Sequence, residues 1–316
     1  MMGNKKNLLV ALCGERPERV PIWLMRQAGR YLPEYQALRK QAGSFMSLCL
    51  TPELAAEVTL QPVKRFGMDG AILFSDILMV PYGLGYALEF IEGKGPVLEK
   101  FFGTMPVFET EKFYSRTSPI YETVKRIKQE KPEKAGLIGF CGGAWTVACY
   151  MLGNSADQFL YARDFSLSAD RIFRQLLDVL VEASGFYLIE QIKAGAEAIQ
   201  IFDSHAGLAP PGMYEDYVVA PTRALVRKIH AVFPHIPVIG FPRQSLVENL
   251  AHYTRETKVT ALSLDTSAGL AWAQENIHAV LQGNLDPKLM EGEAAPMLEA
   301  AATILKTMKK PFVFNL

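Results

Sequence analysis

Two arginines follow directly after an apolar run near the start of the chain. The stretch PIWLMRQAGRYLPEY, residues 21–35, places Arg26 and Arg30 on either side of Ala28 and Gly29. A guanidinium offers a fixed fork of donors that matches a carboxylate or a phosphate, and burying two such cations without an anionic partner is costly. The spacing therefore predicts a binding site for a ligand that carries several negative charges.

A third arginine and an aspartate belong to the same prediction. Arg39 follows the stretch closely, and Asp76 ends the apolar run AILFSD, so its carboxylate leaves a buried strand. Beside arginines this carboxylate is expected to be ionised, and able to accept N–H donors or to balance a developing cation. The structural alternative is that Glu34 or Asp76 only forms an ion pair with the arginines.

A glycine-rich turn marks a second candidate region. The stretch GFCGGAWTVACYM, residues 139–151, places glycines where a strand would turn into a helix. It lacks the GxGxxG pattern and the lysine of a phosphate-binding loop, so it is a weak nucleotide motif. We interpret the glycines as allowing the backbone to approach a bulky flat ligand, with Tyr150 supplying a hydroxyl. Tyr150 as an ordinary core residue is the alternative.

A third region, IFDSHAG at residues 201–207, offers Asp203, Ser204 and His205 side by side. Adjacent residues on a strand point to opposite faces, so this order does not predict a hydrolase triad. For His205 alone a structural role is expected. The histidines and cysteines of the chain show no metal-ligand spacing, so we predict no metal site.

The elements that would position these residues alternate regularly. Eight short apolar runs, separated by segments of helical periodicity, begin at residues 21, 70, 135, 198, 237, 261, 279 and 311. Runs that are apolar on both faces are typical of parallel strands covered on both sides. The pattern predicts an α/β fold, a closed (β/α)₈ or TIM barrel, with an open doubly wound sheet as the alternative.

The domain organisation follows from the same reading. We predict one domain over residues 1–316, with an amphipathic N-terminal helix or segment at 1–20. A long helix is expected over 171–196, ending in a glycine. The stretch PYGLGYALEFIEGKGP, residues 81–96, predicts loops or a small hairpin.

Polar residues gather where the predicted strands end, and in a barrel these positions share the C-terminal face, where active sites occur. This convergence indicates an enzyme. The residues are Arg26, Arg30, Ser75, Asp76, Asp203, Ser204, His205, Arg243, Asp265, Asn284 and Asp286.

The charge balance and cysteine content of the chain limit the kinds of binding partner that we expect. Lysine plus arginine equals aspartate plus glutamate at 33 each, so no global field would attract nucleic acid or an anionic membrane. The four cysteines form no CxxC pair, which fits free thiols in a reducing compartment such as the cytoplasm. No run approaches the roughly 18 apolar residues of a membrane-spanning helix.

Six blocks of the chain, in order, resemble the uroporphyrinogen decarboxylase family: PIWLMRQAGRYLPEY, LQPVKRFGMDGAILFSDIL, GFCGGAWTVACYM, IFDSHAG, GFPR and QGNLDP. The resemblance implies a (β/α)₈ barrel, usually a homodimer with facing mouths, that converts the four acetate side chains of uroporphyrinogen III to methyl groups in haem synthesis. The product would be coproporphyrinogen III, and no metal or organic cofactor is implied. The implied substrate-binding residues are Arg26, Gln27, Ala28, Gly29, Arg30, Asp76, Tyr150 and Ser204, with Arg39 as a further candidate.

This implied chemistry gives the opening stretch a purpose. The substrate carries eight carboxylates, which an arginine cluster would orient. Protonating a pyrrole ring lets the substrate receive the electrons released with carbon dioxide, and Asp76 would stabilise the resulting cation. Arg26 is our candidate proton donor, or the residue that orients the donor. We hypothesise that most arginine contacts hold propionates and non-reacting acetates, because pairing to the leaving carboxylate would stabilise the ground state.

The sequence also departs from the family pattern. The family continues past FVFNL with a Gly-His-Gly turn and a last helix, so the resemblance implies a barrel lacking that helix. The apolar outer face of residues 311–316 is then expected to be exposed. The alternative function is a catalytically impaired tetrapyrrole-binding protein. A corrinoid-type methyltransferase of the same superfamily is a weaker alternative, because no zinc-ligand spacing follows Cys149.

Overall fold

The computed structural model describes residues 6–153 and 158–316. Short helical turns are η1 (Ala206–Leu208), the π-helical η2 (Glu215–Val219) and η3 (Pro287–Glu291). The strands are β1 (Gly70–Ile72), β2 (Leu88–Ile91), β3 (Gly95–Leu98), β4 (Gly136–Gly142), β5 (Ala198–Asp203), β6 (Val238–Pro242), β7 (Ala261–Ser263), β8 (Val280–Gln282) and β9 (Phe312–Val313). The α-helices are α1 (Asn7–Leu12), α2 (Pro33–Ala42), α3 (Phe45–Leu50), α4 (Pro52–Phe66), α5 (Met79–Leu84), α6 (Thr110–Glu130), α7 (Ala144–Leu152), α8 (Gln158–Ser168), α9 (Asp170–Ala194), α10 (Ala220–Val232), α11 (Val247–Thr257), α12 (Leu270–Asn276) and α13 (Ala294–Thr307).

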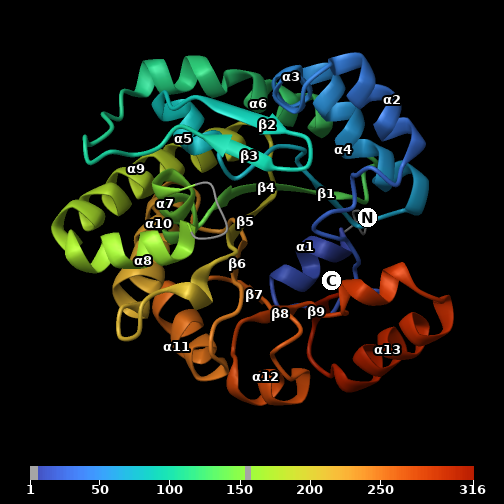
Figure 1. The fold of residues 1–316 in the computed structure, drawn as a ribbon. Helices are drawn as coiled ribbons and strands as arrows, with labels where there is room; N and C mark the ends of the chain where they lie inside the picture. The colour runs from blue at the N-terminus through green and yellow to red at the C-terminus, as the bar shows by residue number, and fades with distance from the viewer. Residues whose placement is uncertain (1–5, 154–157) are drawn as a thin grey trace.

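Seven of the strands form one parallel sheet, around which the helices are arranged (Figure 1). The order is β1-β4-β5-β6-β7-β8-β9, so each strand pairs with its neighbours in the chain apart from the separate β2–β3 hairpin. The ring is completed by the segment around Ile22, which bridges Phe314 in parallel and accepts the N–H of Asp69 on its other side at 2.8 Å. The predicted (β/α)₈ barrel is confirmed.

The first predicted strand is the exception. Residues 21–25 were expected to form a regular strand, but Ile22 makes only an isolated bridge. Backbone hydrogen bonds join the segment to its neighbours on both sides: the N–H of Phe314 donates to the Pro21 carbonyl at 2.9 Å, and that of Asp69 to the Ile22 carbonyl. Side-chain hydrogen bonds add to this short pairing. The indole of Trp23 donates to Gln282 at 3.0 Å, and the amide of Asn315 donates to the Trp23 carbonyl at 2.6 Å. The segment is therefore held in the ring by a short backbone bridge together with buried side-chain contacts.

The other strands follow their sequence patterns. All seven residues of β4 are buried, as are the five of β6, because helices cover one face of the sheet and the barrel interior fills the other. The long helix expected over 171–196 is α9, and it ends at Gly195 with φ of 127°, a conformation that favours glycine. The stretch predicted as loops or a small hairpin contains β2 and β3, which pair antiparallel.

The end of the chain differs from expectation. The outer face of residues 311–316 was expected to be exposed, yet Phe312, Val313 and Phe314 are at most 8% exposed. Helix α1 lies against β9, and the Ile22 segment covers its other edge. The predicted exposed apolar patch is therefore wrong for these residues, because the start of the chain packs against its end.

The N-terminal ends of the strands are closed by α1. The amphipathic segment expected at 1–20 contains this short helix, whose Leu8, Ala11 and Leu12 are buried, while residues 1–5 lie outside the described part. Glu197, just before β5, pairs with Lys6 ahead of α1 and with Lys128 of α6. Within the described ranges no helix is long and apolar enough to cross a membrane.

Candidate functional site

The predicted site residues lie where the elements of the ring end. Arg26 follows the Ile22 segment, Asp76 follows β1, and Ser204 follows β5, while Tyr150 belongs to α7, which begins just after β4. Because these strands are parallel, their C-terminal ends face the same way. The C-terminal face of the barrel therefore gathers residues that are far apart in the sequence.

Asp76 has the most unusual environment among these residues. It is half-buried, and its Oδ1 accepts the N–H of Leu78 at 2.8 Å. Burial raises the pKa of Asp76 to about 6, although the Leu78 N–H and the charge of Arg26 oppose the rise. A carboxyl group with this pKa changes protonation state close to neutral pH and is a candidate for chemistry beside Arg26.

The loop that carries the arginines is shaped by Gln27. Its buried side chain donates to the carbonyl of Gly70 at 2.9 Å and accepts the N–H of Leu24 at 3.1 Å. Arg26 and Arg30 are exposed on either side of it, and no ion pair joins either of them to a carboxylate of the described residues. Gln27 thus fixes the loop by its buried hydrogen bonds to Gly70 and Leu24. Its predicted contact with substrate stays a prediction.

Glu34 does not neutralise the arginines, as one structural alternative proposed. It pairs with Arg65 of α4 at 3.0 Å instead. Arg39 lies half-buried on α2, and its charge and that of Arg30 both counteract the burial that raises the pKa of Tyr35. Two of the predicted arginines therefore lie near one tyrosine.

The turn between the two arginines is formed by small residues. Ala28 and Gly29 are both half-buried there. A Cβ atom added to Gly29 would meet the Tyr31 ring at 3.6 Å, which is an ordinary contact distance. Steric crowding around the missing Cβ atom therefore does not explain why glycine occupies this position.

Tyr150 faces the same region from α7. Burial raises its pKa, and the charge of Asp76 raises it further while that of Arg26 lowers it, so both groups are near. Its ring centroid lies 5.5 Å from that of His205. Burial and the charge of Arg243 lower the pKa of His205 to about 4, so this imidazole is neutral at physiological pH.

Ser204 is placed by a buried link between β5 and α7. Asp203 accepts hydrogen bonds from the N–H and the hydroxyl of Thr146, and the N–H of His205 donates to that hydroxyl at 3.0 Å. Burial raises the pKa of Asp203 to about 6. Ser204, half-buried between Asp203 and His205, is therefore held on a rigid backbone.

The glycines of the second candidate region serve packing within the protein. A Cβ atom on Gly143 would lie 2.4 Å from Cγ of Asp203, and one on Gly142 would lie 2.6 Å from a methyl of Val147. Packing within the protein therefore accounts for glycine at both positions, and the approach of a flat ligand to this turn stays a prediction. Sequence reasoning missed the link through Asp203, because its partner lies 57 residues earlier in the chain.

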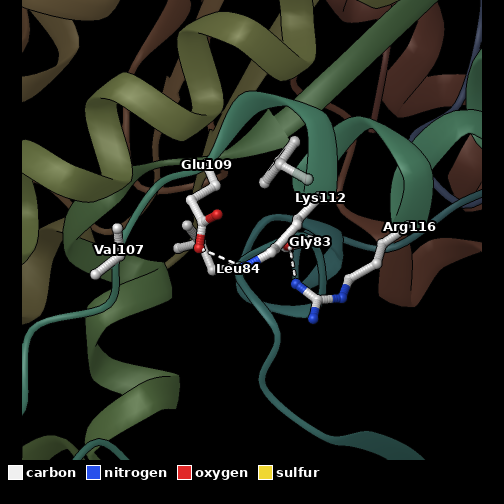
Figure 2. Close-up of a pocket in the computed structure, with 7 residues that line it drawn as sticks. Gly83, Leu84, Val107, Glu109, Lys112 and Arg116 are labelled. Atoms are coloured by element: carbon white, nitrogen blue, oxygen red, sulfur yellow. Dashed lines mark hydrogen bonds and ion pairs between the residues drawn. The ribbon is translucent and has the colours of Figure 1, made fainter.

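A separate pocket of about 240 Å³ opens between α5 and α6. Figure 2 shows that its charged groups contact groups of the protein itself: Lys112 pairs with Glu109 at 2.8 Å, and Arg116 donates to the Gly83 carbonyl at 3.1 Å. No predicted site residue lines it. The lining residues are Gly83, Leu84, Val107, Glu109, Lys112, Phe113 and Arg116. Elsewhere, among the residues that the structure describes, no group of three or more His, Cys, Asp or Glu side chains could hold a metal ion.

Known proteins resemble the chain over nearly its whole length. The family model described as uroporphyrinogen decarboxylase (URO-D) matches residues 4–316. A uroporphyrinogen decarboxylase of Rhodospirillum rubrum is 46% identical over 99% of this chain and 91% of its own length, and one of a Chelativorans species is 44% identical over 99% and 92%. A solved methyltransferase from Methanosarcina mazei has a TM-score of 0.81 at 20% identity, covering 99% of this chain and 92% of its own, which shows a shared fold.

Proposed function

Because the chain belongs to the uroporphyrinogen decarboxylase family, we propose that it acts as a carboxy-lyase in porphyrin and haem biosynthesis, converting uroporphyrinogen III to coproporphyrinogen III. The observation that carries this proposal is Asp76, a half-buried carboxyl group with a pKa of about 6 close to Arg26 and Tyr150. A negative charge held in a partly desolvated site is suited to stabilising a cation that forms during reaction.

In the proposed mechanism the substrate is its own electron sink. Protonation of a pyrrole ring creates an iminium cation. The bond between the acetate methylene and its carboxylate then breaks, carbon dioxide leaves, and the bonding electrons neutralise the cation. The methylene is protonated to a methyl group and the ring loses its added proton, so each decarboxylation consumes one proton overall. This sequence needs no metal or organic cofactor.

The residues divide the work by their charge and position. Asp76 accepts pyrrole N–H donors and stabilises the cationic intermediate more than the neutral substrate. Arg26 donates or orients the proton, and Arg26, Arg30 and Arg39 bind carboxylates that are not reacting. Tyr150 and Ser204 supply hydroxyls.

Supporting roles fall to the residues of the loop. Gln27, Ala28 and Gly29 shape the turn that presents Arg26 and Arg30 and complete the proposed substrate contacts.

We also propose a single-domain enzyme that works in the cytoplasm as a homodimer, as the family resemblance implies. The corrinoid-type methyltransferase alternative gains nothing from the solved methyltransferase, because 20% identity carries the fold alone.

The test is an anaerobic incubation of the chain with uroporphyrinogen III, followed by oxidation and separation of the porphyrins by carboxylate number. Stepwise appearance of porphyrins with seven to four carboxylates is expected. The Asp76→Asn variant, which keeps the shape but loses the charge, is expected to give about a hundredfold less product. A folded wild-type chain that binds uroporphyrin without releasing product would instead support the tetrapyrrole-binding alternative.

A further inference from the structure

Arg243 lies across the barrel from residues 26–30, the loop that carries Arg26 and Arg30 and is called the arginine loop below. It directly follows β6, which ends at Pro242. Around the ring the order is the Ile22 segment, β1, β4, β5, β6, β7, β8 and β9. Since β6 is four positions from the Ile22 segment in either direction, Arg26 and Arg243 follow opposite walls of the barrel.

The backbone of Arg243 is firmly held by its neighbours. Its N–H donates to the carbonyl of Asp203 at 3.1 Å, and its carbonyl accepts the N–H of Gly207 at 3.1 Å. The next residue, Gln244, donates its N–H to Asp265 at 2.6 Å. The segments that follow β5 and β7 thus form hydrogen bonds to the loop after β6. These bonds fix the backbone position from which the Arg243 side chain extends.

The guanidinium of Arg243 is left available. Arg243 is exposed, and across residues 6–153 and 158–316 no carboxylate forms an ion pair with it. The acidic groups on the adjoining loops make other contacts: Oδ1 of Asp203 accepts from Thr146, and Asp265 accepts from the backbone of Gln244 and Ser267. The cation therefore has room for an external anion.

Its position relative to the proposed site follows from His205. The charge of Arg243 helps to lower the pKa of this imidazole, and the imidazole in turn lies 5.5 Å from the Tyr150 ring. The charge of Arg243 therefore lies near His205, which in turn lies beside Tyr150.

We propose that Arg243 is a further substrate-binding residue, which pairs with a peripheral carboxylate of the tetrapyrrole opposite the Arg26–Arg30 loop. This inference rests on the proposed function. The carboxylates of such a substrate are distributed over all four pyrrole rings, so a loop on one wall of the barrel cannot reach them all. A fork of donors on the opposite wall holds the far edge of the macrocycle and limits its rotation.

The experiment compares Arg243→Gln with Arg227→Gln, a matched loss of an exposed arginine from the outer helix α10. Two quantities are measured for each: the steady-state constants for uroporphyrinogen III, and the dissociation constant for uroporphyrin III by fluorescence anisotropy. Uroporphyrin III is the oxidised form of the substrate and keeps all eight carboxylates. Circular dichroism verifies that each variant is folded.

Arg243→Gln is expected to raise both KM and the dissociation constant about tenfold with kcat unchanged, as loss of one hydrogen-bonded ion pair implies. Arg243→Lys keeps the charge without the fork and should fall between wild type and Arg243→Gln. Arg227→Gln should match wild type. A folded Arg243→Gln protein whose KM and dissociation constant equal those of Arg227→Gln would overturn the inference.

The two measurements separate this inference from the proposed function. If the wild-type chain binds uroporphyrin III but releases no product, the decarboxylase proposal fails, and the anisotropy comparison still decides the role of Arg243. If Arg243→Gln lowers kcat at unchanged KM, the proposed binding role is wrong. A wild-type chain that binds neither ligand overturns both.

Discussion

At the scale of single residues, Asp76 makes the proposed reaction sensitive to pH. Its pKa of about 6 lies above the ordinary value of 3.8, so protonation begins at a higher pH than for an exposed aspartate. The protonated acid has no charge with which to stabilise a cation, so kcat/KM should fall about tenfold per pH unit below about pH 6. Rates measured from pH 5 to 8 test this. A profile that stays flat down to pH 5 would contradict the role of Asp76.

Arg30 provides a second prediction at this scale. If it holds a carboxylate that does not react, Arg30→Ala removes binding that ground state and transition state share. KM should rise about tenfold with kcat unchanged. Steady-state kinetics on Arg30→Ala, with Arg227→Ala as the control, measures this. A lowered kcat at unchanged KM would place the Arg30 contact in the transition state instead.

At the scale of elements, the link between β5 and α7 positions two groups of the proposed site. Thr146 donates to Asp203 through its N–H and hydroxyl, and Tyr150 lies one turn further along α7. Thr146→Val keeps the shape but leaves the buried carboxylate one donor short. The free energy of unfolding should drop by about 1–3 kcal/mol, and kcat/KM should fall because Tyr150 is less well placed.

Urea denaturation and steady-state kinetics test this prediction. Thr146→Ser keeps the hydroxyl and is expected to retain most of both the stability and the activity. Thr123→Val is the matched control, because that buried hydroxyl bonds only to the Pro119 carbonyl within α6. Equal losses for Thr146→Val and Thr123→Val would show that the β5–α7 link has no special importance.

At the scale of the whole molecule, the barrel should unfold as one unit. The buried side chains of its sheet and surrounding helices form one continuous core, from Leu8 in α1 to Phe314 beside β9. The closing contacts join the two ends of the described chain, so neither half keeps its core when the other unfolds. Calorimetry is expected to show a single transition with equal calorimetric and van't Hoff enthalpies. Two separated transitions would contradict a single domain.

The sequence by itself determined most of the segments that form strands, the exception being residues 21–25, and where the polar residues after them lie. A strand that is covered on both faces appears in the sequence as a continuous apolar run, which can be recognised from adjacent residues alone. The strands β4, β5 and β6 therefore lie close to their expected positions. The six blocks that resemble the family can also be recognised from the sequence alone, because a motif is defined by the order of residue types along the chain. Asp76 and Arg26 lie within these blocks, so the motifs alone indicate them as site residues.

Only the tertiary structure decided what each of these residues touches. It showed that Gln27 points inward to Gly70, that Gly143 makes room for Asp203, and that Arg243 stands opposite the arginine loop. Such contacts join residues that are distant in the chain, and local periodicity carries no record of them. Burial likewise sets the pKa of Asp76, because desolvation depends on every element that surrounds the carboxylate.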